Sequence, residues 1–224
     1  MIRPILACLL LLAAPAIAQT NLAEGFRKLP AGSRIALMPV DVELFQISAG
    51  GILEPRADWT TAAAGHLKSA YRERMAKLGS QVVELADEES DAMAQLRRLN
   101  AAVSAAISLH HFGSNPLPTK ERKLDWTLGS DVRLIRERTG ADYALFTFVR
   151  DSYATQERVA SVIVALVLGF AMPPGGVQLG YASLVDLTGG RVLWFNQMLR
   201  SHGDLRERER ALETVQALLE GFPE

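Results

Sequence analysis

Short apolar runs alternate along the chain with amphipathic stretches, and this alternation predicts strands and helices in turn. Arg34–Val40 has the composition of a buried first strand, and Val42–Ile47 is a short extended piece after it. The nearly continuous apolar run Tyr143–Val149 is typical of a central strand that is covered on both faces. Gln178–Leu187 and Arg191–Met198 predict a hairpin. Strands are therefore expected in both halves of the chain.

Longer stretches carry apolar residues at three- and four-residue spacing, as amphipathic helices do. We expect a first helix from an N-cap at Asp58 to a stop at Gly79, followed by a short strand at Gln81–Leu85. A long second helix follows an acidic cluster, a third lies near Leu128–Thr139, and a last one is capped by Asp204. The apolar stripe of the first helix consists of Trp59, Ala63, Leu67, Ala70, Tyr71, Met75 and Leu78.

Strands that alternate with helices and end in a hairpin and a helix indicate an α/β fold. We expect a mixed β-sheet packed by amphipathic helices, with an apolar insertion before the C-terminal hairpin and helix. The length of 224 residues suits one domain of ordinary size. The expected organisation is a signal peptide at 1–18, a lead segment at 19–33 and a single α/β domain at 34–224.

The first eighteen residues have the features of a secretory signal peptide. Arg3 supplies the positive n-region, Ile5–Ala14 is an apolar run, and Ala16-Ile17-Ala18 gives the small-x-small cleavage pattern. The apolar run is shorter than the roughly 20 residues that a spanning helix needs, although an uncleaved anchor stays an alternative. We therefore expect export to the periplasm, with cleavage before Gln19 and association with the outer membrane left open.

Cys8 is the single cysteine of the chain and lies inside the apolar run of the signal peptide. No complete hydrophobic region precedes it, so lipidation of Cys8 is not expected unless translation starts upstream of Met1. Removal of the signal peptide leaves a mature chain without cysteine. Thiol catalysis, disulfides and cysteine-ligated zinc are then excluded together.

The charges are balanced, with 24 Lys and Arg against 25 Asp and Glu. Proteins that bind nucleic acid through its phosphates carry an excess of Lys and Arg, so a nucleic-acid partner is not expected.

The most unusual segment is Val159–Met172, which has fourteen residues without a charge and ends before Pro173-Pro174. As a helix it would span about 21 Å, which is short of the roughly 30 Å hydrocarbon core of a bilayer. Apolar residues occupy every helical face, so the segment needs to be covered on nearly all sides.

Three interpretations of this segment stay open: a helix buried in the domain, a surface that self-associates or docks on an envelope protein, and partial contact with a membrane surface. Its position between the Tyr143–Val149 strand and the hairpin favours the second, because an insertion there can project from the fold. The candidate interaction surface consists of Val162, Ile163, Leu166, Val167, Phe170 and Met172.

The hairpin carries a recurrent pattern. Val185-Asp186 ends one strand, Thr188-Gly189 forms the turn, and Val192-Leu193-Trp194 returns. With Gly140-Ala141-Asp142-Tyr143 before the central strand, this arrangement resembles bacterial envelope proteins related to the curli-secretion-channel subunit and the TolB amino-terminal domain. The resemblance covers mainly Leu134–Trp194.

The resemblance implies assembly or binding at the outer membrane, and it transfers no catalytic residue. Many members of these families are lipoproteins, and this chain differs from them in lacking a lipidated cysteine. The pore-forming insertions of the secretion-channel relatives alternate polar and apolar residues, whereas Val159–Met172 does not, so a pore is not expected. From the residues alone, Asp186 and Thr188 are expected to bond turn amides, and Trp194 to be a core anchor.

Candidate chemistry is sparse, and no metal or cofactor is expected. His110 and His111 are adjacent and would point about 100° apart on a helix, while His66 and His202 stand alone. The glycine-rich stretch 173–180 lacks the Gly-Lys-Ser/Thr ending of a phosphate loop, and the Gly-x-Ser-x-Gly motif of serine hydrolases is absent. Paired carboxylates for glycoside hydrolysis stay possible, and the first to check are Asp41, Glu43, Glu54 and Asp58.

These observations favour a non-enzymatic periplasmic accessory or assembly factor of the bacterial cell envelope. It would act through protein–protein contacts around Val159–Met172 and the Asp186–Trp194 hairpin. The first alternative is a periplasmic module that binds a small ligand or a cell-wall fragment, and the second is an unrecognised periplasmic hydrolase. Leu166→Asp separates the assembly factor from the ligand-binding module. The substitution would abolish folding if the helix is buried, but would only weaken association if the helix is exposed.

Overall fold

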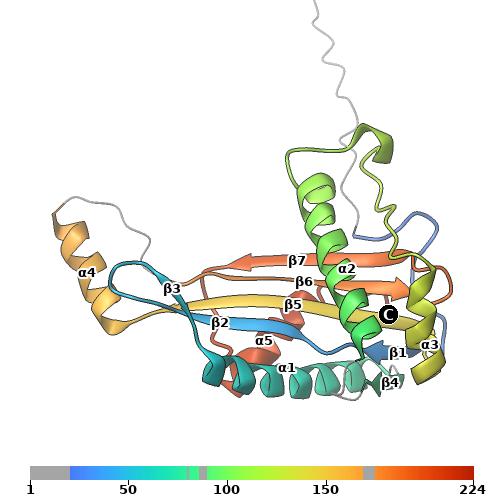
Figure 1. Cartoon of the computed structure of the whole chain (residues 1–224), viewed down its shortest axis with the longest axis horizontal. Coiled ribbons are helices and arrows are strands. Elements are labelled where there is room, and N and C mark those ends of the chain that lie inside the picture. The colour runs from blue at the N-terminus through green and yellow to red at the C-terminus, as the bar shows by residue number, and fades with distance from the viewer. Residues whose placement is uncertain (1–20, 80, 86–89, 169–174) are drawn as a thin grey trace, which may run out of the picture.

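The longest strand of the computed structural model, β5, organises a mixed sheet (Figure 1). The structure describes residues 21–79, 81–85, 90–168 and 175–224. The strands in these ranges are β1 (Arg34–Leu37), β2 (Asp41–Ile47), β3 (Leu53–Pro55), β4 (Gln81–Glu84), β5 (Tyr143–Ala154), β6 (Gln178–Asp186) and β7 (Val192–Arg200). The α-helices there are α1 (Ala57–Lys77), α2 (Asp91–Ile107), α3 (Arg133–Thr139), α4 (Gln156–Val167) and α5 (Arg208–Leu218).

β1 and β2 lie one after the other along the same edge of β5, and both run parallel to it. Leu37 is opposite Leu145 and Asp41 is opposite Phe148, so residues 38–40 face only residues 146–147. The extra residue falls at Pro39, which has no N–H to donate to a ladder. β4 pairs parallel with β1 on its outer side, and β3 pairs antiparallel with β2. The other edge of β5 pairs antiparallel with β6, which pairs with β7.

Two helical layers cover the sheet. Successive side chains of β5 point to opposite faces, so Leu145 and Val149 join one apolar cluster while Ala144 and Phe146 join the other. The first cluster includes the buried residues of α1 and α5, and the second includes those of α2 and α3. The four helices therefore sandwich the sheet, and α4 lies beyond its end (Figure 1).

The lead segment packs against the domain. Leu22 lies opposite Trp194, the Ala23 amide donates to the Leu193 carbonyl at 2.8 Å, and Ala23 and Leu29 are buried. Residues 21–29 therefore contribute to the core and cover part of the outer edge of β7.

The expected α/β class with a mixed sheet is confirmed. The first strand, the hairpin strands and the stripe of α1 also agree with the structure, while β5 continues to Ala154, beyond the expected Val149. The short strand expected at Gln81–Leu85 is β4.

Both expected acidic N-caps are wrong. α1 begins at Ala57 after an Arg56 cap, and Asp58 pairs with the Arg56 guanidinium at 2.8 Å. α5 begins at Arg208, four residues after Asp204, whose carboxylate accepts from the backbone and side chain of Arg206. In each case a neighbouring arginine competes with the helix amides for the carboxylate.

The hairpin turn follows the expected chemistry at Asp186, whereas the Thr188 hydroxyl accepts from Arg136 and from no turn amide among the described contacts. The Thr188 amide donates to Asp186 Oδ1 at 3.1 Å and the Gly189 amide to Oδ2 at 3.0 Å, while Gly190 has a φ of 78°. Trp194 is fully buried and packs edge-on against Phe222, which confirms a core role.

The turn is also tied to the rest of the chain. Arg133 Nε donates to the Thr188 carbonyl at 3.1 Å, and Arg136 Nη1 donates to its hydroxyl at 3.0 Å. Leu128 adds a backbone bond to the Gly190 carbonyl at 2.8 Å. Partner contacts were expected around this hairpin, but its turn is already hydrogen-bonded to α3 and to the loop before α3.

In the described ranges, no helix has both the length and the apolar character needed to cross a membrane. The expected signal peptide, the acidic residues 87–89, Phe170 and Met172 lie outside the described residues.

Candidate functional site

α4 projects from the end of the sheet where β5 finishes (Figure 1). Thr155 follows β5 directly and is the N-cap of α4, because its Oγ1 accepts from the Arg158 amide at 3.1 Å. Glu157 lies in the first turn, where its charge complements the helix dipole. The local sequence thus starts a helix at the point where the chain leaves the sheet.

Most of the apolar side chains of α4 are exposed to solvent. Within α4, only Arg158 and Val162 are buried. Leu166 is 68% exposed and Val167 is 82% exposed. The interpretation of this segment as a buried helix is therefore wrong for the part that the structure describes. The large apolar side chains exposed here are Val159, Ile163, Val164, Leu166, Val167 and Leu168.

One residue of the expected interaction surface needs correction. Val162 is only 6% exposed, so it anchors α4 and does not belong to the surface. Ile163, Leu166 and Val167 are exposed as that expectation requires. Leu166 lies one turn after Val162 on the same side of α4, so its exposure comes from the helix projecting beyond the sheet.

The turn between β2 and β3 lies beside the start of α4 and also exposes apolar side chains. Ile52 and Leu53 are exposed there, and the Arg158 guanidinium donates to the Ala49 carbonyl at 3.5 Å. We call Ile52, Leu53 and the six exposed apolar residues of 159–168 the apolar end. Single exposed apolar residues are common on proteins, whereas large contiguous apolar patches are typical of contact sites.

A buried polar network lies at the base of α4. Asp151 is only 2% exposed, and its carboxylate accepts from the Ser152 amide at 2.9 Å, from the Tyr153 hydroxyl and from Gln178 Nε2. Burial raises the pKa of Asp151, and the three donors oppose that effect. The Leu205 amide donates to Tyr153 Oη at 2.7 Å.

The network extends to the C-terminal helix. Arg200 Nε donates to Gln178 Oε1 at 2.7 Å, and Arg200 Nη2 donates to Thr214 Oγ1 at 2.6 Å. These bonds join the ends of β5, β6 and β7 to α5. They fix the strand ends from which α4 leaves, and we assign the network this positioning role.

A small cavity of about 160 Å³ borders this network, and His202 lines it together with Asp151. The exposed His202 makes no hydrogen bond to Asp151 among the described contacts, and the Asp151 oxygens already have three donors. The bonds of Asp151 therefore join the strand ends and do not involve His202 among the described contacts.

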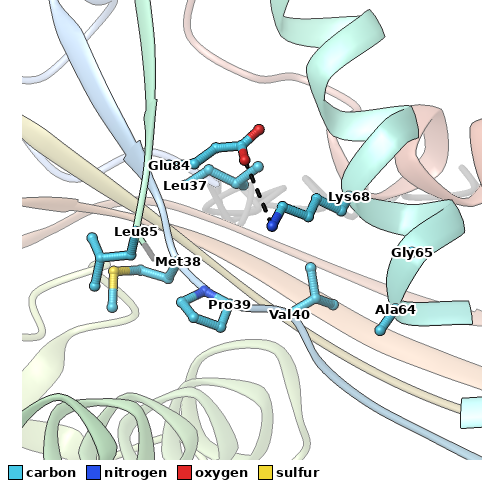
Figure 2. A pocket seen from close by; sticks show the side chains of 9 residues that line it. All are labelled: Leu37, Met38, Pro39, Val40, Ala64, Gly65, Lys68, Glu84 and Leu85. Atoms are coloured by element: carbon cyan, nitrogen blue, oxygen red, sulfur yellow. Dashed lines mark ion pairs between the residues drawn. The ribbon is translucent and has the colours of Figure 1, made fainter. Parts of the chain in front are cut away.

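A second cavity, of about 320 Å³, lies beside the break between β1 and β2 (Figure 2). Its floor is apolar, and Lys68 of α1 points toward Glu84 of β4 across it, at 3.7 Å between Nζ and Oε2. Glu84 also accepts two bonds from Arg72, which hold the pKa of its carboxyl below the usual range. Two cations therefore share the single carboxylate of Glu84 on this wall.

The carboxylates singled out for hydrolysis are mostly held by arginines. Arg150 lies between Asp41 and Glu43 and pairs with both, at 2.7 and 3.3 Å. Asp58 pairs with Arg56, and Glu54 lies on the exposed strand β3. The structure therefore brings Asp41 and Glu43 together around a cation and gives no facing acid pair among these four.

Two of the histidines, His66 and His111, make contacts within the fold. His66 Nδ1 lies 3.0 Å from the Leu205 carbonyl, and His111 is buried against Phe112. Within the described part of the chain, no group of three or more His, Cys, Asp or Glu is placed to hold a metal ion.

Comparison with known proteins gives similarity only at the level of structure. No family model matches the chain, and no curated protein matches it. The PelC dodecamer from Paraburkholderia phytofirmans is similar to this chain with 13% identity and a TM-score of 0.41, covering 88% of this chain and 92% of PelC.

Two further solved structures have the same 13% identity. Lipoprotein GNA1162 from Neisseria meningitidis has a TM-score of 0.33 and covers 82% of this chain and 90% of its own. The LpoB C-terminal domain from Salmonella enterica has a TM-score of 0.30, with coverages of 80% and 88%. Likeness at this level transfers no activity, partner or oligomeric state to this chain.

Sequence reasoning missed two parts of this region. Ile52 and Leu53 look like an isolated apolar pair in a glycine-rich turn, and the sequence does not show that this turn contacts Arg158 at the start of α4. The Asp151 network joins residues of β5, β6, β7 and α5, and no spacing of residues along the chain predicts that they meet. The strand was expected to end at Val149, so no feature of the sequence indicated that Asp151 is buried within β5.

Proposed function

We propose that this chain is an exported, non-enzymatic accessory or assembly factor of the bacterial cell envelope. It acts through protein–protein contacts of the apolar end, and a second copy of the chain is the first partner to test. The single observation that supports this proposal is the exposure of the apolar residues of α4 beyond the sheet.

The exposed apolar side chains favour association, because a partner would remove them from water. Residues 159–168 contain no charged side chain, and most of their large apolar groups are exposed. Each square ångström of apolar surface removed from water contributes about 25 cal/mol. Covering the apolar end by another protein surface is therefore favourable, and the buried network beneath α4 holds the helix in position to be covered.

The sequence supports the location. The first eighteen residues have the pattern of a signal peptide, and the hairpin resembles those of envelope proteins that assemble or bind at the outer membrane. Neither feature supplies a catalytic group, which agrees with a role in binding.

The test is the absolute mass of purified mature chain, residues 19–224, by light scattering after size exclusion without detergent. We expect a defined oligomer for the wild type, and a smaller mass for Leu166→Asp with an unchanged circular dichroism spectrum. Leu109→Asp is the matched control, because Leu109 is also an exposed leucine but lies in the π-helical turn Ser108–Phe112 that follows α2. A monomeric wild type at all concentrations, or equal effects of both substitutions, contradicts self-association through the apolar end.

A further inference from the structure

A cavity of about 390 Å³ lies between the β2–β3 hairpin, the start of α4 and the first residues of β6. Its walls combine apolar side chains, among them Ile47, Leu53, Val177 and Leu179, with the guanidinium of Arg158. Leu53, Val177 and Leu179 are exposed to solvent. The cavity thus presents to water a set of aliphatic groups next to a cation.

Arg158 is the unusual member of this site. It is only 8% exposed, yet its guanidinium makes one long hydrogen bond, 3.5 Å from Nη1 to the Ala49 carbonyl, and no ion pair among the described residues. The segment 169–174, which follows α4, contains no Asp or Glu. A buried cation without a carboxylate partner is costly, because desolvation is not offset by a counter-charge.

The other charged groups at the cavity are already occupied. Arg150 pairs with Asp41 and Glu43, and its guanidinium lies 4.1 Å from the ring centre of Phe148. The carboxylate of Asp151 is held by donors from Ser152, Tyr153 and Gln178. Arg158 is therefore the group in this cavity with donor capacity left for a ligand.

Gly51 keeps the approach to Arg158 open. A Cβ at this position would lie 3.5 Å from Arg158 Nη1, and the φ of Gly51 is 84°, a value that favours glycine. The hairpin turn therefore passes close to the guanidinium without a side chain that would cover it.

We propose that this cavity binds a single-chain anionic amphiphile, with its acidic head on Arg158 and its aliphatic chain along Ile47, Leu53, Val177 and Leu179. A planar guanidinium offers paired donors that match a carboxylate or a phosphate. The volume lies near the lower end of the roughly 300–1,000 Å³ range of ligand cavities, which suits one acyl chain. The head can come from a free fatty acid or from a phosphate-bearing lipid.

Isothermal titration calorimetry of the mature chain tests the proposal with three dodecyl probes below their micelle concentrations. These are dodecanoate, dodecyl phosphate and dodecyltrimethylammonium. We expect saturable one-to-one binding of at least one anionic probe, and no saturable binding of the cationic one. The tighter of the two anions identifies the source, a free fatty acid or a phosphate-bearing lipid.

Substitutions locate the site. Arg158→Gln is expected to weaken binding of the preferred anion at least ~10-fold, the usual loss for a hydrogen bond to a charged group, and Arg158→Lys less than that. Leu53→Ser weakens it several-fold, and it cannot unfold the domain because Leu53 is exposed. Arg138→Gln, an exposed arginine of α3, is the matched control and leaves binding unchanged.

Three results would overturn the proposal. They are no saturable binding of either anion to the wild type, equal binding of the cationic probe, and affinity unchanged by both Arg158→Gln and Leu53→Ser. Leu53 belongs both to this cavity and to the apolar end, whereas Arg158 belongs to the cavity alone. Loss of binding in Arg158→Gln with an unchanged oligomeric mass therefore distinguishes this site from the association through the apolar end.

Discussion

Val162 and Leu166 lie one turn apart on α4, and the structure gives opposite predictions for the same substitution at the two positions. Val162 is 6% exposed and Leu166 is 68% exposed. Val162→Asp removes the burial of a valine side chain, about 1.5–3 kcal/mol, before the cost of a buried carboxylate is added. Leu166→Asp removes little burial, and an acidic residue near the C-terminus of a helix costs about 0.3–1 kcal/mol.

The rate of trypsin cleavage after Arg158 measures how often α4 opens. Arg158 is the only basic residue between Arg150 and Arg191, so cleavage after it gives a diagnostic pair of fragments. When opening is fast relative to cleavage, the rate follows the population of the open helix, and about 1.4 kcal/mol corresponds to a tenfold change. We expect Val162→Asp to be cleaved after Arg158 roughly 10- to 100-fold faster than the wild type, and Leu166→Asp no more than about fivefold faster.

The fragments are followed by mass spectrometry at the lowest workable protein concentration, so that association does not protect the helix. Tryptophan fluorescence in urea checks that the rest of the domain is equally stable in both variants. Similar cleavage rates for the two variants, or faster cleavage of Leu166→Asp, would refute the assignment of Val162 as the anchor and Leu166 as surface.

Three further predictions concern the buried Tyr71–Thr147 hydrogen bond, the Asp151 carboxylate and the hairpin-turn glycine Gly190. Tyr71→Phe leaves the buried Thr147 hydroxyl without its 2.8 Å partner and should cost about 1–2 kcal/mol in urea unfolding, whereas Tyr71→Phe combined with Thr147→Val should cost less than Tyr71→Phe alone; additive losses would contradict this pairing. Because burial raises the folded-state pKa of Asp151 above its unfolded value, the protonated carboxyl favours folding below about pH 4 and that contribution is lost as the pH rises through the raised pKa. The stability of the wild type should therefore fall relative to Asp151→Asn in urea unfolding as the pH rises from about 4, and parallel profiles would contradict a raised pKa. Gly190→Ala should cost more than Gly32→Ala in thermal unfolding, since both have a positive φ of about 80° but only at Gly190 would a Cβ overlap the Gly129 carbonyl; equal losses would show that the contact is relieved at no cost.

The sequence predicts those parts of the fold that depend on local periodicity. The α1 stripe and the hairpin through Thr188-Gly189-Gly190 follow from side-chain spacing and turn chemistry, and both agree with the structure. Asp58 and Asp204 failed as caps because Arg56 and Arg206, two residues away, take their carboxylates. Competition of this kind depends on side-chain geometry that a capping pattern does not contain.

The candidate site was predictable only in part. The segment from Val159 onward is apolar on every helical face, so its pattern carries no information on which side is covered. That Val162 faces inward and Ile163 outward depends on where β5 ends and on the direction in which Thr155 starts the helix. The burial of Arg158 follows from the β2–β3 turn passing over it, a contact between residues more than a hundred positions apart.

Hydrogen exchange at several protein concentrations tests the central claim, contact through the apolar end, most directly. Exchange of helical amides follows local opening, and a partner that covers α4 slows it. We predict that peptides covering residues 156–168 and 48–53 exchange more slowly as the concentration of mature chain rises, while α1 is unaffected, and that Leu166→Asp removes the effect. Exchange in α4 that is independent of concentration, or protection that appears elsewhere and survives Leu166→Asp, would contradict the account.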